Sequence, residues 1–189
     1  NHTIKRHMRR YIYFVFLLCC AVNLLLTSCV RQKYVVMDMV HHNPGEAMTE
    51  SKFLDPSFLK KNEYGAKVFF LFEAAQFGID WKSFDPSLFP ATTEAGRWVA
   101  EKAEIIHKKY DAAKKEDLQV YCMLDMLVLP SLLVEKHRTE LTNEQGKLDI
   151  SKPYTQLCIR ELMKEMFETF PQLDGLVIRT GETYLHDAP

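Results

Sequence analysis

Charged side chains stand near the ends of four apolar runs, and their types and positions could support chemistry. They are Asp38, Glu73, Asp125 and Arg179, and Glu182 follows Arg179 closely along the chain. Carboxylates in such places could serve as general acids or bases. A carboxylate at the end of a buried run is costly without a partner, and Arg179 could be that partner for Asp38, Asp125 or Glu182.

The elements that must position these groups are apolar runs of strand length, at residues 34–40, 66–73, 118–125 and 175–179. Helical patterns separate them. Asp55 as N-cap, with Pro56 after it and Gly65 as a stop, predicts a helix over 57–64. Thr93 is a possible N-cap for a long helix whose apolar positions follow the 3.6-residue period: Val99, Ala103, Ile106, Tyr110 and Ala113.

Two more helices are expected before the last strand. A short one covers 131–137. A longer one opens at 151–153 and carries an apolar stripe made of Ile159, Leu162, Met163, Met166 and Phe170.

Continuously apolar strands separated by helices indicate an α/β fold with a parallel sheet. A doubly wound sheet and a (β/α)₈ barrel are both built this way. Three features favour the barrel: the charged strand ends, the long loops after the first three strands, and the lack of a glycine-rich phosphate loop. A full barrel needs about 250 residues, so we expect residues 34–189 to be the N-terminal half of a TIM barrel, truncated after about four β/α units.

The first 28 residues have the pattern of an export signal. A basic stretch from Lys5 to Arg10 precedes the uncharged run 11–26. That run is shorter than the roughly 20 apolar residues that cross a bilayer as a helix. We therefore expect residues 1–28 to be a signal peptide rather than a membrane anchor.

The run ends in Leu26-Thr27-Ser28-Cys29, which resembles the bacterial lipoprotein box. This resemblance implies that Cys29 is lipidated and that 29–33 form a short tether. It also implies a place in the bacterial cell envelope, on the periplasmic or outer-surface face, with the membrane as a partner. An ordinary signal peptide with a chance cysteine is the alternative.

Composition excludes other classes of protein. The chain has 189 residues, 47% of them hydrophobic, with 24 Lys and Arg against 25 Asp and Glu. This balance excludes a disordered chain and a polybasic nucleic-acid binder, so we expect no nucleic-acid partner. Cys122 and Cys158 lie in apolar segments and are expected to be core residues rather than a disulfide.

The segment 170–175, followed by an apolar strand that ends in Arg179 and Glu182, resembles strand four of (β/α)₈ glycoside hydrolases. The segments 35–45 and 72–78 are similar to bacterial lipoproteins of this kind. The resemblance covers roughly 34–189. It implies a carbohydrate-active enzyme with an oligo- or polysaccharide substrate and no cofactor.

Glycoside cleavage uses two carboxylates, one to protonate the leaving oxygen and one to attack or to activate water. The resemblance implies that Glu182 is the acid/base and that the second carboxylate lies in the missing half of the barrel, so this part alone is expected to be inactive. Supporting or substrate-binding roles fall to Asp38, Glu73, Asp125, Arg179, Tyr184 and His186. Glu182 could instead be the nucleophile, or a loop carboxylate paired with Arg179.

Two other functions stay open: a noncatalytic glycan-binding lipoprotein, and a metal-dependent barrel hydrolase. The metal hypothesis uses His41 and His42 with Glu73 and Asp125. Adjacent histidines on an extended segment point in opposite directions, so we expect no metal. The aromatic residues of the long second loop could stack on sugar rings or fill the top of the barrel: Phe77, Trp81, Phe84 and Phe89.

Overall fold

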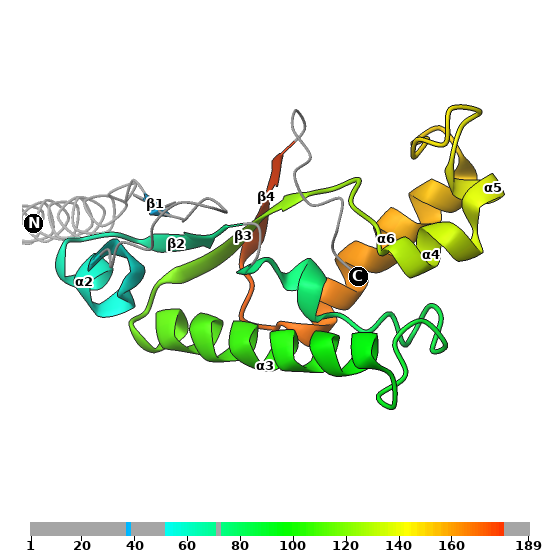
Figure 1. Ribbon diagram of the computed structural model, residues 1–189. Helices are drawn as coiled ribbons and strands as arrows, with labels where there is room; N and C mark the ends of the chain where they lie inside the picture. The colour runs from blue at the N-terminus through cyan, green and yellow to red at the C-terminus, as the bar shows by residue number, and fades with distance from the viewer. Residues whose placement is uncertain (1–36, 39–51, 71–72, 180–189) are drawn as a thin grey trace, which may run out of the picture. The chain divides into compact units, whose positions relative to one another are not determined.

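The sheet is parallel throughout, and its strands follow one another in chain order (Figure 1). The computed structural model describes residues 37–38, 52–70 and 73–179. A two-residue strand lies at one edge, and three longer strands follow it: β1 (Met37–Asp38), β2 (Ala66–Phe69), β3 (Gln119–Asp125) and β4 (Gly175–Arg179). All described residues belong to the compact unit Val35–Pro189.

The register of the sheet aligns the carboxyl ends of β3 and β4. Tyr121 lies opposite Gly175, and Asp125 lies opposite Arg179. On the other side of β3, Val68 lies opposite Tyr121. Because side chains alternate along a strand, these residues share one face of the sheet.

The helices occupy the connections between the strands. They are the 3₁₀ turns η1 (Lys52–Leu54) and η3 (Ala75–Gly78), and the helices α2 (Pro56–Lys61), α3 (Glu94–Lys115), α4 (Ser131–Lys136), α5 (Arg138–Leu141) and α6 (Pro153–Thr169). Two N-caps predicted from sequence are confirmed: the Asp55 carboxylate accepts a bond from the Ser57 N–H, and the Thr93 hydroxyl accepts one from the Gly96 N–H. Helix α2 ends earlier than expected, because the chain turns at Glu63 in the left-handed region (φ 65°) instead of at Gly65.

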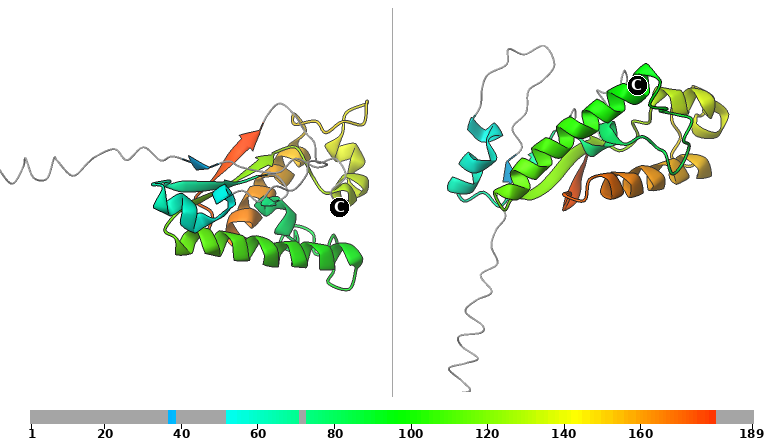
Figure 2. Two further views of the ribbon diagram at one scale, coloured as in Figure 1. Left: turned by 60° about the vertical axis from the view of Figure 1, so that its left-hand side comes forward. Right: turned by 90° about the horizontal axis from the view of Figure 1, so that it is seen from below.

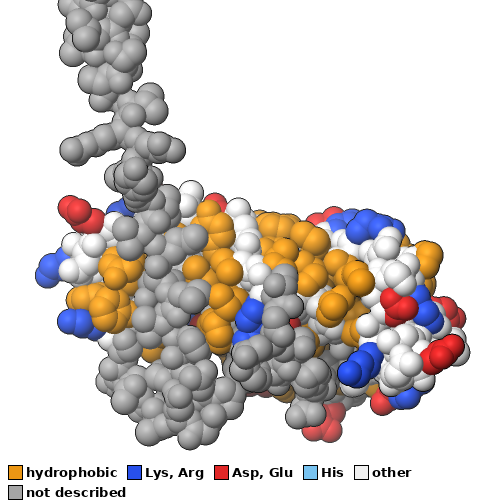
Figure 3. All heavy atoms as spheres, turned by 90° about the horizontal axis from the view of Figure 1, so that it is seen from above, with side chains coloured by type: hydrophobic (Ala, Val, Ile, Leu, Met, Phe, Trp, Pro, Cys, Tyr) orange, Lys and Arg blue, Asp and Glu red, His pale blue; other side chains and the backbone are white. Residues whose placement is uncertain are grey.

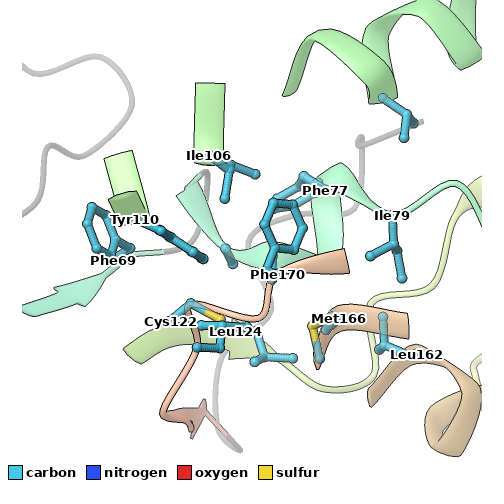
Figure 4. Close-up of a cluster of buried hydrophobic side chains, with 14 of the residues drawn as sticks. Phe69, Phe77, Ile79, Ile106, Tyr110, Cys122, Leu124, Leu162, Met166 and Phe170 are labelled. Carbon is cyan, nitrogen blue, oxygen red and sulfur yellow. The ribbon is translucent and has the colours of Figure 1, made fainter. Parts of the chain in front are cut away.

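The core lies between the helices and one face of the sheet (Figures 2 and 4). Tyr110 of α3 is at its centre, with its ring centroid 4.7 Å from that of Phe69 and 5.6 Å from that of Phe170. The side chains of β3 that face it are Val120, Cys122 and Leu124, and α6 adds Leu162 and Met166. The apolar stripes read from the sequence therefore become the contact surfaces of α3 and α6.

The prediction of a truncated TIM barrel is wrong. The described strands form a small open sheet, in which β1 and β4 lie at opposite edges. Closure into a barrel needs more strands with a regular stagger. The features that favoured the barrel, apolar strands with charged carboxyl ends, are common to parallel sheets and say nothing about closure.

The cysteine prediction is confirmed for the body of the chain. Cys122 and Cys158 are both buried and both free. None of the helices in the described part of the chain has the length and apolar character to cross a membrane. The predicted signal peptide 1–28, Cys29 and the tether 29–33 lie outside the described residues.

Candidate functional site

A buried ion pair joins the carboxyl ends of β3 and β4. The Arg179 Nε and Nη2 atoms each donate to one oxygen of the Asp125 carboxylate, both at 2.6 Å. The Asp125 side chain is 1% exposed and that of Arg179 is 19% exposed. Two parallel bonds of this kind fix the guanidinium in position and in orientation.

The strand alternation explains why the pair lies where it does. Tyr121, Met123 and Asp125 point away from the core that β3 shares with α3 and α6. Val68 and Met123 are buried as well, but they lie outside that core. Figure 3 shows hydrophobic side chains gathered on the face of the molecule opposite α3.

A small cavity lies beyond the carboxyl ends of β2 and β3, with a volume of about 20 Å³. Gln76 and Phe77 of η3 line it on the β2 side. Leu129 and its chain neighbours line it after β3, and Trp81 and Leu162 of α6 complete the wall. The loop after β3 is tied to the ion pair through the backbone, because the Val128 N–H donates to the Asp125 carbonyl oxygen at 3.1 Å.

Two features of the cavity wall are unusual. Gln76 is 8% exposed, and neither its Nε2 nor its Oε1 has a hydrogen-bond partner among the residues that the structure describes. Trp81 is buried with φ at 55°, a backbone conformation that a bulky residue rarely adopts. Buried unpartnered groups and strained backbone concentrate at functional sites, and no sequence pattern marks Gln76.

The structure places the predicted site residues in different ways. Asp125 and Arg179 are brought together, as their sequence positions suggested. Glu73 is turned toward α3, where its carboxylate pairs with Lys109 and its carbonyl oxygen accepts a bond from the Tyr110 hydroxyl at 2.9 Å. Asp38 is in β1, next to β2.

The other predicted groups cannot be placed. Glu182, Tyr184 and His186 lie outside the described residues, as do His41 and His42. Within the described residues, no three His, Cys, Asp or Glu side chains are grouped so that they could hold a metal ion.

The aromatic residues of the second loop are packed in the core or against it. Trp81, Phe77 and Phe89 are buried there, and Phe84 contacts Trp81 with ring centroids 6.0 Å apart. A stacking platform would need exposed ring faces. These residues therefore fill space between the loop and the helices.

Neither buried thiol is prepared to act as a nucleophile. Burial raises the pKa of the Cys122 thiol, and it raises that of Cys158 to about 11. A thiol must lose its proton to attack, so both groups are inert at neutral pH.

We compared the chain with family models, with curated proteins and with solved structures, and none of the three comparisons finds a match.

Proposed function

We propose that the chain belongs to an exported, lipid-anchored carbohydrate-active protein that cleaves glycosidic bonds at the carboxyl edge of its parallel sheet. The observation that supports this most is the Asp125–Arg179 pair at the ends of two adjacent strands. In α/β folds, ligands bind outside the carboxyl ends of the strands. A buried ion pair adds little net stability, so its place at this edge favours a role in arranging a site.

The geometry divides the roles of the carboxylates. Both oxygens of Asp125 accept bonds from Arg179, so Asp125 acts as a positioning residue rather than as the acid or base. Glu182 follows β4 by three residues in the sequence and is the proposed acid/base. Glycoside cleavage needs a second carboxylate, which labelling with a fluorinated glycoside and peptide mapping would identify.

The test of catalysis uses the product of the full-length gene and a panel of aryl glycosides. Glu182→Gln is expected to lower kcat by at least about 100-fold, because general acid–base catalysis contributes that much. Glu144→Gln, at an exposed loop carboxylate, is the matched control and should keep full activity. Activity that survives Glu182→Gln would remove Glu182 from catalysis, and saccharide binding without turnover would favour the noncatalytic glycan-binding alternative.

The anchor is tested separately, because it does not depend on catalysis. Cells expressing the full-length gene are fed a radiolabelled fatty acid. The protein is expected to carry the label, and Cys29→Ser is expected to lose it. Cys20→Ser is the control, since Cys20 lies within the predicted signal peptide. A label that remains on the Cys29→Ser protein would overturn the lipid anchor.

A further inference from the structure

We propose that His107 is a proton-controlled latch, which holds helix α3 to the turn before β4 while its imidazole is neutral and releases the turn when the imidazole gains a proton. The turn comprises residues 170–174, between α6 and β4. The latch does not depend on the proposed function. It rests on three side chains that lie in contact, those of His107, Asp111 and Gln172.

Gln172 links the turn to α3 through its side-chain amide. The Gln172 Nε2 atom lies 2.7 Å from the Asp111 Oδ1 atom and 3.3 Å from the His107 Nδ1 atom. The ring of His107 also packs on the ring of Phe170, with the two centroids 4.5 Å apart. Because Phe170 is buried in the core, the imidazole is held between the helix and the turn.

Asp111 determines which way the Gln172 amide points. An ionised carboxylate only accepts hydrogen bonds, so the amide nitrogen has to face it. The amide oxygen is then turned to a buried position, where it has no hydrogen-bond partner among the described residues. Turning the amide over would place this oxygen against the carboxylate, so the orientation is kept despite the cost of the unpartnered oxygen.

The amide in turn determines the tautomer of His107. Because the Gln172 Nε2 atom donates, the His107 Nδ1 atom must accept, and the ring proton must be on Nε2. A proton added to Nδ1 would place two donors face to face and break this contact. The imidazolium is then attracted to Asp111, which lies one turn further along α3. The turn keeps the ion pair between Asp174 and Lys114, so the release is local.

The other charged groups near His107 leave Asp111 as the carboxylate that responds to its proton. The charged groups on the elements around His107 are two carboxylate–lysine pairs and two further carboxylates: Glu104 with Lys108, Asp174 with Lys114, Asp111 and Glu168. The lysines neutralise two of these carboxylates. Asp111 contacts the same amide nitrogen as His107, so it is the neighbour that gains most from an imidazolium.

The first experiment observes the tautomer. The full chain is labelled with ¹⁵N in histidine, and the ring nitrogens are observed by NMR at about pH 8, the upper end of the range in which histidine usually titrates. The His107 signals are identified by nuclear Overhauser contacts with the Phe170 ring. They should show an unprotonated Nδ1 and a proton on Nε2. A proton on Nδ1 would overturn the latch.

The second experiment measures the release of the turn. Hydrogen exchange of the full chain is followed by mass spectrometry at about pH 8 and about pH 5.5, with the rates corrected for the intrinsic effect of pH. The Leu173 and Asp174 N–H groups report on the turn, because they donate to the Phe170 and Val120 carbonyl oxygens at 3.0 and 2.8 Å. Their protection should fall by about three- to tenfold at the lower pH, the equivalent of one hydrogen bond.

Matched variants separate the latch from a general effect of acid. His107→Asn keeps an acceptor near the position of Nδ1 and cannot titrate, so protection of the turn should no longer depend on pH. Gln172→Glu should reverse the dependence, because a carboxylate accepts from the imidazolium and is repelled by Asp111 when His107 is neutral. His137→Asn is the control and should behave like wild type, since His137 packs against Tyr154 instead.

The outcomes decide the matter in either direction. Equal protection of the wild-type turn at both pH values would overturn the latch, as would a fall in His107→Asn as large as that in wild type. If His107→Asn does not fold, the tautomer in wild type and the sign of the pH dependence in Gln172→Glu still test it.

Discussion

Asp125 and Arg179 depend on each other in an unequal way. The Asp125 carboxylate is almost wholly buried, while part of the Arg179 side chain reaches solvent. Removing the arginine therefore leaves a buried charge without its bidentate partner, whereas removing both charges leaves an apolar face. The pair is thus expected to be costly to break and cheaper to replace.

This inequality gives a prediction at the residue scale. Arg179→Met should lower the free energy of unfolding by about 3–5 kcal/mol, because it strands the Asp125 carboxylate. The double variant Asp125→Leu with Arg179→Met should be more stable than Arg179→Met alone. Urea denaturation followed by circular dichroism measures both. If the double variant is the less stable of the two, the unpaired Asp125 carboxylate does not destabilise the Arg179→Met protein.

Sequence reasoning could find this pair and could not find Gln76. Asp125 and Arg179 close apolar runs, and parallel strands bring such ends to one edge, so their contact follows from pattern alone. Gln76 lies in the short 3₁₀ turn η3, whose sequence shows no hydrophobic periodicity. Its amide has no hydrogen-bond partner within the described part of the chain, and this is a property of packing that a sequence does not display.

At the scale of elements, α3 depends on a close approach at its first turn. A Cβ atom placed on Gly96 would lie 2.1 Å from the Pro90 carbonyl oxygen, which is backbone and cannot move aside cheaply. Helix propensity favours alanine over glycine by about 1 kcal/mol, so propensity and packing oppose each other here. The steric clash with the Pro90 carbonyl oxygen is expected to outweigh the gain in helix propensity.

Gly96→Ala is therefore expected to destabilise the protein by more than about 1 kcal/mol, with the sign opposite to that of helix propensity. Ala112→Gly, at an exposed position of the same helix, is the reference and should cost about 1 kcal/mol from propensity alone. Thermal unfolding of both variants tests this. A Gly96→Ala protein more stable than wild type would mean that the Phe89–Pro90 backbone can move away from α3.

The limits of most elements could be predicted, since they depend on local chemistry. The Thr93 cap fixes the start of α3, and the last strand begins at Gly175 and ends at Arg179 as expected. Strand β2 ends at Phe69, four residues before its apolar run does. Composition cannot tell where an apolar segment leaves the sheet and enters η3, because both are buried.

At the scale of the whole molecule, the Asp85–Lys136 ion pair makes the free energy of unfolding depend on pH in the acid range. The Asp85 carboxylate accepts a bond from Lys136 of α4 and two from Ser87. These bonds lower the pKa of Asp85 to about 2, with the bond from Lys136 the largest cause. Since the folded pKa lies below the usual value, the pair stabilises the fold above about pH 4 and loses this effect as the pH falls toward 2.

Lys136→Met should therefore reduce the free energy of unfolding at pH 6 by about 0.5–1 kcal/mol, a modest value because the lysine side chain is 46% exposed and solvent screens the pair. The deficit relative to wild type should shrink between pH 4 and pH 2. Urea titrations across this range measure it, with Lys147→Met in an exposed loop as the control. A deficit that stays constant from pH 6 to pH 2 would show that Lys136 stabilises the fold by packing rather than by its charge.

The overall architecture is where sequence reasoning failed. Alternating strands and helices predicted a parallel sheet, and the strands are parallel. Whether the sheet closes on itself depends on the twist and stagger of all its strands together. No single run of residues carries that information, so the sequence could not separate an open sheet from a barrel.

The order of the strands also bears on how fast the protein folds. Asp125 and Arg179 are 54 residues apart, and β2 meets β3 across a similar separation. Before the two strands of a pair can form hydrogen bonds, the chain must close the long loop between them, helix included. This closure costs conformational entropy that the later contacts offset. Helix α3 can form within microseconds, but the four described strands include no hairpin that could nucleate the sheet. The newly made chain should thus spend a comparatively long time with its strands unpaired, during which it remains open to chaperones.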